Sequence, residues 1–291
     1  KTPLMPPPQK TVINTSLPDG NPVSARIELN SPRMLREGYS GFPGTESPYT
    51  IFTNVDGTGD AFLLPDIDYT ATISRGFSFE VDHKTIPANT TALESVLPRK
   101  IKPRPGWYGG DCHTHSVYSD GSFTPAQVVE GARAEGLDWV VLSDHGQGPD
   151  VPTIRRAHKE AIEAANSSGF LVIPGEEFSA DSFHANIFNG IVDKQYSDSL
   201  QSVIDTVIDA DTEQVPLTIG WNHPFGHGKD LVDENLVGLP LLEVWNTKLG
   251  DEEKSTIDLW WSWLIQGKRV FAETGTDNHH RVDNLYGHRR T

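Results

Sequence analysis

Residues 110–145 read GDCHTHSVYSDGSFTPAQVVEGARAEGLDWVVLSDH, and this stretch decides the fold class. A Thr-Pro pair at 124–125 marks a helix start, with a capping hydroxyl and proline at the first helical position, and the helical pattern runs to 136. The apolar run WVVL follows at 139–142, and a weaker strand candidate lies before the helix at 110–113. The stretch therefore predicts a strand, a helix and a second strand, which is the repeating unit of a parallel sheet.

The same alternation continues toward the end of the chain. Short apolar runs are separated by helical stretches, and 184–189 is a further weak strand candidate. About seven strand–helix units result, which predicts an α/β fold whose largely parallel sheet closes into a barrel. The other strand runs lie at 170–173, 217–219, 241–245 and 270–272, and the other helices at 153–168 and 251–266.

The first third of the chain has a different pattern. Apolar and polar residues alternate there, as at Tyr69, Ala71 and Ile73, and turn-forming residues separate the alternating segments. This pattern predicts a small all-β sandwich module. The expected organisation is a proline-rich extended lead-in at 1–10, the β-sandwich module at 11–97, a basic proline-rich linker at 98–106 and the α/β domain at 107–291.

Charge and composition exclude several classes of partner. A formal net charge of −16 argues against nucleic acid and against an anionic membrane surface, because both need clustered Lys and Arg. The sequence contains no run of about 18 apolar residues, so no membrane-inserted segment is predicted. Cys112 is the single cysteine, so no intrachain disulfide can form, and its expected role is that of a small buried hydrophobe.

The two ends of the sequence suggest a longer natural chain. It starts at Lys1 rather than Met, so a removed secretory leader and an extracellular or periplasmic location are expected, with a cytoplasmic one left open. Its last residues resemble the middle of a domain, so the natural chain is expected to continue beyond Thr291.

Polar residues that can bind metal follow the ends of the predicted strands. In a βα barrel the carboxyl ends of the strands share one face, so residues far apart in the sequence are expected to form one site. His113 and His115 are two residues apart on an extended segment, so both can face one ion. Imidazoles and carboxylates without thiolates suit Zn, Mn or Fe. The strand-end residues are His113, His115, Asp144, His145, Glu176, Glu177, His223, Asp277 and His279.

Five segments in this order resemble the motif series of the PHP (polymerase and histidinol phosphatase) superfamily, and the resemblance covers about 107–291. Within that superfamily, the β-rich leader followed by WYGGDCHTHSVYSDG resembles the carbaryl-hydrolase-like CehA/McbA metallohydrolases. The segments are HTHSVYSDG at 113–121, SDH at 143–145, PGEE at 174–177, NHP at 222–224 and TDNH at 276–279.

The resemblance implies a distorted (β/α)7 barrel of PHP type with two or three divalent metal ions. Its Gly-x-Glu pattern selects Glu177 rather than Glu176, and its Asp-x-His pattern selects His279 rather than His280. Carried across, the first ion is held by His113, His115, Glu177 and Asp277, the second by Glu177 as a bridge with His184 and His223, and the third by Asp120, His145 and His279.

Clustered divalent ions lower the pKa of a bridging water and polarise the oxygen under attack. The leading expectation is a metal-dependent phosphoesterase that acts on a mono- or diester of a small molecule or polymer. The alternative is a carbamate, amide or carboxylic-ester hydrolase, as the carbaryl-hydrolase resemblance suggests. If the third ion position is vacant, Asp120 and His145 are expected to handle protons or to support the ligands.

Two further features bear on catalysis. Glu243 ends the predicted strand 241–245, so it either supports a ligand or faces the substrate, and Arg281, Arg289 and Arg290 could meet an anionic substrate. The catalytic candidates are accordingly Asp120, His145, Glu243 and Arg290.

The third possibility is a non-catalytic extracellular protein whose metals staple the fold, with the β-module binding sugar or mediating self-assembly through its strand edges. A structural zinc site is closed and four-coordinate, so nine candidate ligands favour an enzyme.

Overall fold

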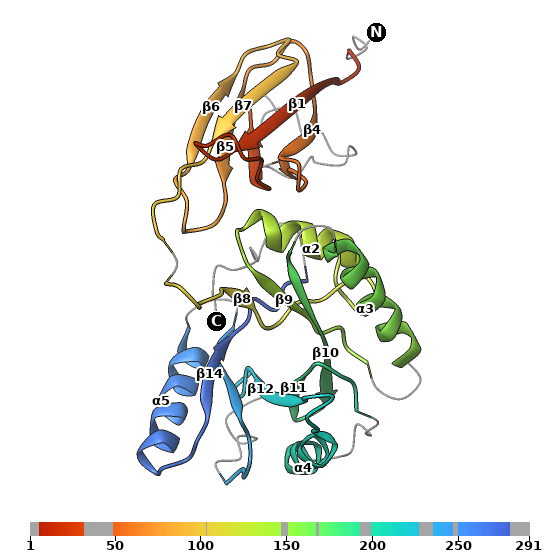
Figure 1. The fold of residues 1–291 in the computed structure, drawn as a ribbon, viewed down its shortest axis with the longest axis vertical. Helices are drawn as coiled ribbons and strands as arrows, with labels where there is room; N and C mark the ends of the chain where they lie inside the picture. Colours follow the sequence, from red (N-terminus) through yellow and green to blue (C-terminus); the bar gives the residue numbers. More distant parts are fainter. Residues whose placement is uncertain are drawn as a thin grey trace. The chain divides into compact units, whose positions relative to one another are not determined.

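The computed structural model describes residues 6–31, 49–102, 104–146, 151–166, 169–192, 199–226, 235–246 and 250–279. The chain divides into two compact units, which are described separately below (Figure 1). The first comprises residues 1–107 with 130–137, and the second comprises residues 108–129 with 138–291.

The first unit contains two sheets that share one hydrophobic core. The strand order is β4-β1-β7 in one sheet and β3-β2-β5-β6 in the other, and Ile13 and Ile73 bring fully buried side chains from one sheet each. The alternation predicted at Tyr69, Ala71 and Ile73 is confirmed, because all three are buried. The strands are β1 (Gln9–Ser16), β2 (Arg26–Asn30), β3 (Tyr49–Phe52), β4 (Thr58–Leu63), β5 (Tyr69–Ser74), β6 (Asp82–Ile86) and β7 (Ala92–Val96).

The second unit contains a seven-stranded sheet that curls into a nearly closed barrel, in the order β14-β13-β12-β11-β10-β9-β8 (Figure 1). Backbone hydrogen bonds beyond the two end strands bring its edges together: Asp277 N–H donates to His113 O (2.9 Å), and His115 N–H donates to Asn278 O (3.1 Å). The strands are β8 (Gly110–Asp111), β9 (Trp139–Leu142), β10 (Leu171–Ala180), β11 (Phe183–Phe188), β12 (Thr218–Asn222), β13 (Leu241–Trp245) and β14 (Phe271–Thr274).

The described residues contain four helices, and the last three of them pack on this sheet. The four helices are α2 (Pro125–Ala134), α3 (Val151–Ala165), α4 (Leu200–Ala210) and α5 (Asp251–Ile265). Three of them agree with the predicted helices to within three residues at each end. Buried side chains of α4 and α5 pack with the strands in one core, where Val203, Trp221 and Trp263 are almost wholly inaccessible.

The sheet is mixed, which corrects the expectation of regular strand–helix units. The strand predicted at 170–173 continues as β10 to Ala180, and a two-residue turn at 181–182 leads into β11. A turn that short joins antiparallel neighbours and leaves no room for a helix. β11 is therefore antiparallel to both β10 and β12, while the other neighbouring strands are parallel.

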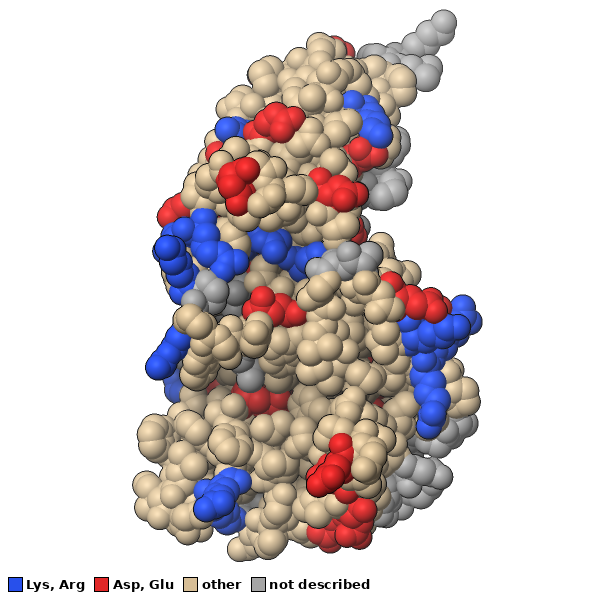
Figure 2. Space-filling model, in the orientation of Figure 1, with Lys and Arg blue, Asp and Glu red and all other residues tan. Residues whose placement is uncertain are grey.

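Charged side chains are spread over the described surface (Figure 2). On the face drawn in Figure 2, acidic and basic side chains stand in small separate groups with neutral surface between them. Among the described helices, none is both long and apolar enough to cross a membrane.

Candidate metal centre

The predicted ligands reach one end of the barrel from six of its strands. His113 and His115 follow β8, His145 follows β9, and Glu177 lies within β10. His184 stands near the start of β11, and because β11 runs antiparallel, its amino end lies at the rim formed by the carboxyl ends of the parallel strands. The remaining predicted ligands are His223 after β12, Asp277 and His279 after β14, and Asp120 in the loop after His115.

The innermost group contains His113, His115, Glu177 and Asp277, the four residues expected at the first ion. The two histidine Nε2 atoms lie 3.0 Å apart. Glu177 Oε2 is 3.1 and 3.2 Å from them, and Asp277 Oδ1 is 3.3 and 3.2 Å from them. A tetrahedron with ion-to-ligand distances of about 2.0 Å has edges of about 3.3 Å, so these separations suit four donors around one small cation.

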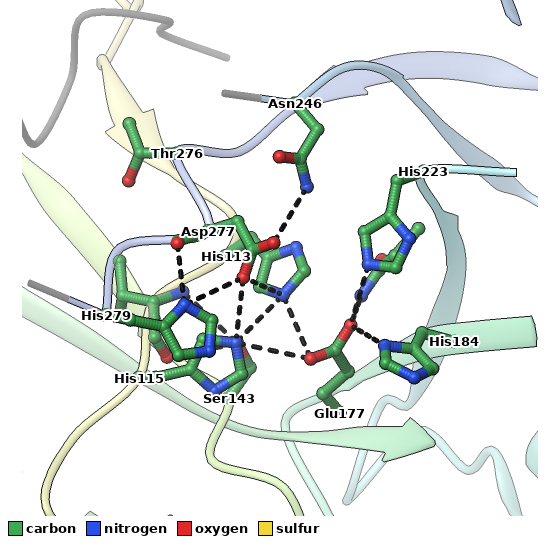
Figure 3. Close-up of polar contacts among 12 residues, drawn as sticks. His113, His115, Ser143, Glu177, His184, His223, Asn246, Thr276, Asp277 and His279 are labelled. Atoms are coloured by element: carbon green, nitrogen blue, oxygen red, sulfur yellow. Dashed lines mark hydrogen bonds and ion pairs between the residues drawn. The ribbon is translucent and has the colours of Figure 1, made fainter. Parts of the chain in front are cut away.

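The two oxygens of Glu177 face different sets of histidines (Figure 3). Oε2 faces the inner pair, whereas Oε1 lies 3.1 Å from His184 Nδ1 and 3.4 Å from His223 Nε2. Asn222 Nδ2–H also donates to Oε1 (2.8 Å) and fixes its direction. Each oxygen of Glu177 therefore has its own set of imidazole neighbours.

The third group is the most exposed. Asp120 Oδ1 lies 3.1 Å from His279 Nε2, and Asp120 Oδ2 lies 3.6 Å from His145 Nε2. The side chain of Asp120 is 57% exposed, compared with 0% for His113 and His115. His113, His115 and Glu177 of the inner group are thus enclosed by protein, while the outer group borders solvent.

His145 belongs to more than one group. Its Nε2 faces Asp120, but its Nδ1 lies 3.3 Å from Glu177 Oε2 and 2.5 Å from Ser179 Oγ. His145 also forms a group with Glu177 and His184 that could hold an ion. His145 therefore lies within reach of both the second and the third ion position.

The carboxylates and imidazoles shift each other's protonation. Burial would raise the pKa of Glu177, but the charge of His113 and hydrogen bonds from several histidines hold that pKa well below its usual value. Burial would lower the pKa of His115, but hydrogen bonds to Asp277 and Glu177 raise that pKa to about 9. Without an ion, protons on the inner imidazoles balance the carboxylates, and a divalent cation can take their place.

The donor set fits a divalent cation. Nitrogen and carboxylate oxygen atoms converge without a thiolate, which is the chemistry that Zn, Mn and Fe accept. Nδ1 of His115 is buried and has no hydrogen-bond partner in the described part of the chain, and it lies 3.9 Å from Asp120 Oδ1. The converging His, Asp and Glu side chains are therefore suited to binding divalent metal.

Two carboxylates that follow predicted strands do not join these groups. Glu176 points to the other face of β10 and accepts the backbone N–H of Val192 (3.1 Å), as expected for the residue next to Glu177. Asp144 accepts hydrogen bonds from Ser116 and Ser119 and so supports the loop that carries Asp120.

Glu243 lies behind His113 and is 2% exposed, so the structure does not support a substrate-facing role for it. The predicted catalytic residue Arg290, together with Arg281, Arg289 and His280, lies outside the described residues. Three residues that the sequence analysis did not name contact the predicted ligands: Asn222, Asn246 and Ser179. The two asparagines stand at strand ends, and this position is the one sequence signal that could have indicated them.

Part of the chain that carries these residues matches a known domain family. Residues 111–235 match the PHP domain. The matched segment includes the inner histidines, Glu177 and His223, whereas Asp277 and His279 lie beyond it. No protein of curated function matches the chain.

Three solved structures illustrate the similarity. A two-domain protein from Bacteroides vulgatus, described as containing a PHP-like metal-dependent phosphoesterase, is 23% identical (TM-score 0.43), and the alignment covers 60% of this chain and 52% of that one. A protein described as a metal-dependent phosphoesterase from Bifidobacterium adolescentis is 17% identical (TM-score 0.42), with 65% and 94% covered. An amidohydrolase from Chromobacterium violaceum with bound sulfate is 17% identical (TM-score 0.41), with 62% and 90% covered.

The chain thus spans about half the length of the Bacteroides protein. None of these similarities distinguishes the carbaryl-hydrolase-like family within the PHP superfamily.

Proposed function

We propose that this protein is a metal-dependent hydrolase of the PHP type that cleaves phosphate mono- or diesters. The observation that carries the proposal is the position of Glu177, whose two oxygens face two different sets of imidazoles at the barrel rim. A single structural ion needs one closed set of four ligands, whereas a bridging carboxylate serves two adjacent ions.

The residues around Glu177 would hold these ions and keep them in place. His113, His115 and Asp277 complete the inner set, and His184 and His223 complete the second set. Bound divalent ions would supply a water of lowered pKa and an electrophile for the phosphoryl oxygen. The chain therefore needs no serine or cysteine nucleophile, and Cys112 is buried.

The exposed outer group faces the side from which a substrate can approach. His279 Nδ1–H donates to Asp277 O (2.9 Å), which leaves Nε2 directed at Asp120 Oδ1. This pair would either hold a third ion or carry a proton between Nε2 and the leaving oxygen of the ester. His145 contributes in the first case as a ligand and in the second case as a neutral hydrogen-bond partner, because burial lowers its pKa to about 4.

Phosphate esters are proposed ahead of carbamates or carboxylic esters because the barrel segment matches the PHP domain. The proposal is tested with chelator-stripped protein reconstituted with Zn²⁺, Mn²⁺ or Fe²⁺. Turnover of p-nitrophenyl phosphate, bis-p-nitrophenyl phosphate and an aryl carbamate is measured together with the metal content per chain.

Hydrolysis of either phosphate substrate with two or more ions per chain is the expected result. Turnover of the carbamate alone would favour the alternative hydrolase, and bound metal without turnover of any ester would favour a structural role. Fewer than two ions per chain would contradict the multinuclear site.

A further inference from the structure

Glu243, on β13, lies behind the metal ligands rather than among them. Its Oε1 accepts a hydrogen bond from Nδ1–H of His113 (3.0 Å). Its Oε2 accepts the backbone N–H of His223 (2.9 Å) and one N–H of the Asn246 amide (3.0 Å). One buried carboxylate therefore contacts a ligand of the first ion position and a ligand of the second.

Asn246 extends this contact to a third ligand residue. Its Nδ2 also lies 3.3 Å from Asp277 Oδ2, on the side of the carboxylate away from the inner histidines (Figure 3). Glu243 and Asn246 thus connect residues that follow three different strands, β8, β12 and β14.

The contact with His113 decides which ring nitrogen can bind a cation. Nε2 faces Glu177 and Asp277, so its lone pair must be free and the ring proton must reside on Nδ1. Glu243 Oε1 accepts a hydrogen bond from this Nδ1–H and so orients the ring. A carboxylate in this position also makes the imidazole a stronger donor to a metal.

Two of the contacted residues, His223 and Asp277, have backbone conformations that L-residues rarely adopt. His223 has a φ of +27° and Asp277 has a φ of +50°. Such residues persist only where their surroundings fix them. Gly275 provides the space, because a Cβ there would lie 2.3 Å from His113 Cβ and 2.5 Å from Glu243 Oε1.

We propose that Glu243, assisted by Asn246, is a positioning residue that fixes the tautomer of His113 and the backbone of His223. It thereby sets the affinity for the two ions at the first and second positions, called the inner ions below, although it binds neither. This inference rests on the metal-dependent function proposed above and assigns a role to a residue outside the ligand set.

Glu243→Gln is a sharp test because glutamine has almost the same shape. If the amide oxygen faces His223 N–H and Asn246, the amide NH₂ faces His113 and moves the ring proton to Nε2, where it blocks the ion. If the amide is turned round, its NH₂ meets the backbone N–H of His223. We expect about 10–100-fold weaker binding of Zn²⁺ or Mn²⁺, measured by competition with a chelator of known affinity.

Glu176→Gln is the matched control, since Glu176 is equally buried, accepts a backbone N–H from Val192 and belongs to none of the metal-binding groups of the described residues. Its ion affinity should equal that of the wild type. Asn246→Ala should weaken binding about two- to tenfold, the effect of losing one hydrogen bond. Co²⁺ absorption spectra should change in Glu243→Gln and remain unchanged in Glu176→Gln.

A purely structural role for Glu243 would lower the unfolding temperature of the metal-free protein without changing the ion affinity or the Co²⁺ spectrum, and that result would overturn the inference. Equal affinities of Glu243→Gln and Glu176→Gln would do the same. If the wild type itself binds no ions, the proposed function fails instead, so the two failures are distinguishable.

Discussion

Replacing Glu177 should remove both inner ions, whereas replacing Glu176 should remove neither. The two carboxylates are neighbours on β10 and equally buried, but strand alternation sends them to opposite faces. Glu177→Gln keeps the size of the side chain and removes the charge that lies between His113 and His115 on one side and His184 on the other.

The size of the effect follows from the number of ligands. A four-ligand zinc site contributes about 10–16 kcal/mol, so one ligand is worth about 3 kcal/mol, or about a hundredfold in affinity. Because Glu177 faces both sets of imidazoles, this loss should apply to each inner ion. In the metal-free protein the variant should also lower the pKa of His113, since the charge of Glu177 is the largest of the effects that raise it.

The assay is the metal content per chain after reconstitution at limiting free Zn²⁺ or Mn²⁺, determined by elemental analysis for the wild type and both variants. Glu176→Gln should match the wild type. If Glu176→Gln loses as much metal as Glu177→Gln, or if Glu177→Gln loses only one ion, the bridging position of Glu177 is wrong.

Three further predictions concern protonation. Hydrogen bonds to Asp277 and Glu177 outweigh burial and raise the pKa of His115 to about 9, so a bound metal ion must displace a proton from this ring. The affinity of the protein for the ion should therefore rise by up to about tenfold per pH unit between pH 7 and about 9. Chelator competition at several pH values checks this, and an affinity that does not change with pH would contradict it. Burial and the charge of Glu243 raise the pKa of Glu273 from 4.5 to about 8, so the metal-free folded state keeps a proton that the unfolded chain loses, and its stability falls as pH rises through this window. Glu273→Gln should therefore gain stability over the wild type by up to about 1.4 kcal/mol per pH unit in urea unfolding, and a constant difference from pH 5 to pH 8 would refute the shift. Burial lowers the pKa of His158, whose Nε2–H donates to Gly175 O (2.7 Å). Below about pH 6.5 this histidine is therefore protonated in the unfolded chain while it stays neutral in the folded state, and the folded state loses stability. His158→Gln keeps a donor and should lose less stability than the wild type when thermal unfolding is compared at pH 7 and pH 5.

Local patterns predicted much of the barrel. The Thr-Pro helix start and the WVVL run gave α2 and β9 nearly at their observed bounds, because capping and apolar runs act through neighbours in the sequence. α4 was not predicted although Ser199 caps it and Leu200, Val203 and Ile204 have helical spacing, so that signal was present but unused.

The length of β10 could not be predicted. Pro174 and Gly175 normally end a strand, yet β10 continues through them because Pro174 pairs in register with Leu142 of β9 and Gly175 allows close approach to Val141. Pairing with β11 then extends the strand to Ala180.

The sequence by itself determined the chemical type of the site, because that depends on residue identity. The two-residue period of an extended chain placed Glu176 and Glu177 on opposite faces, and the resemblance to the PHP pattern selected Glu177 as the ligand. The resemblance implied His184 as a ligand, but only the tertiary structure shows how it reaches the rim, because β11 runs antiparallel to its neighbours. The tertiary structure also decided that Glu243 lies behind His113, a contact between residues 130 positions apart. No local pattern encodes such a contact, because it arises only when the curled sheet brings β13 next to the segment that follows β8.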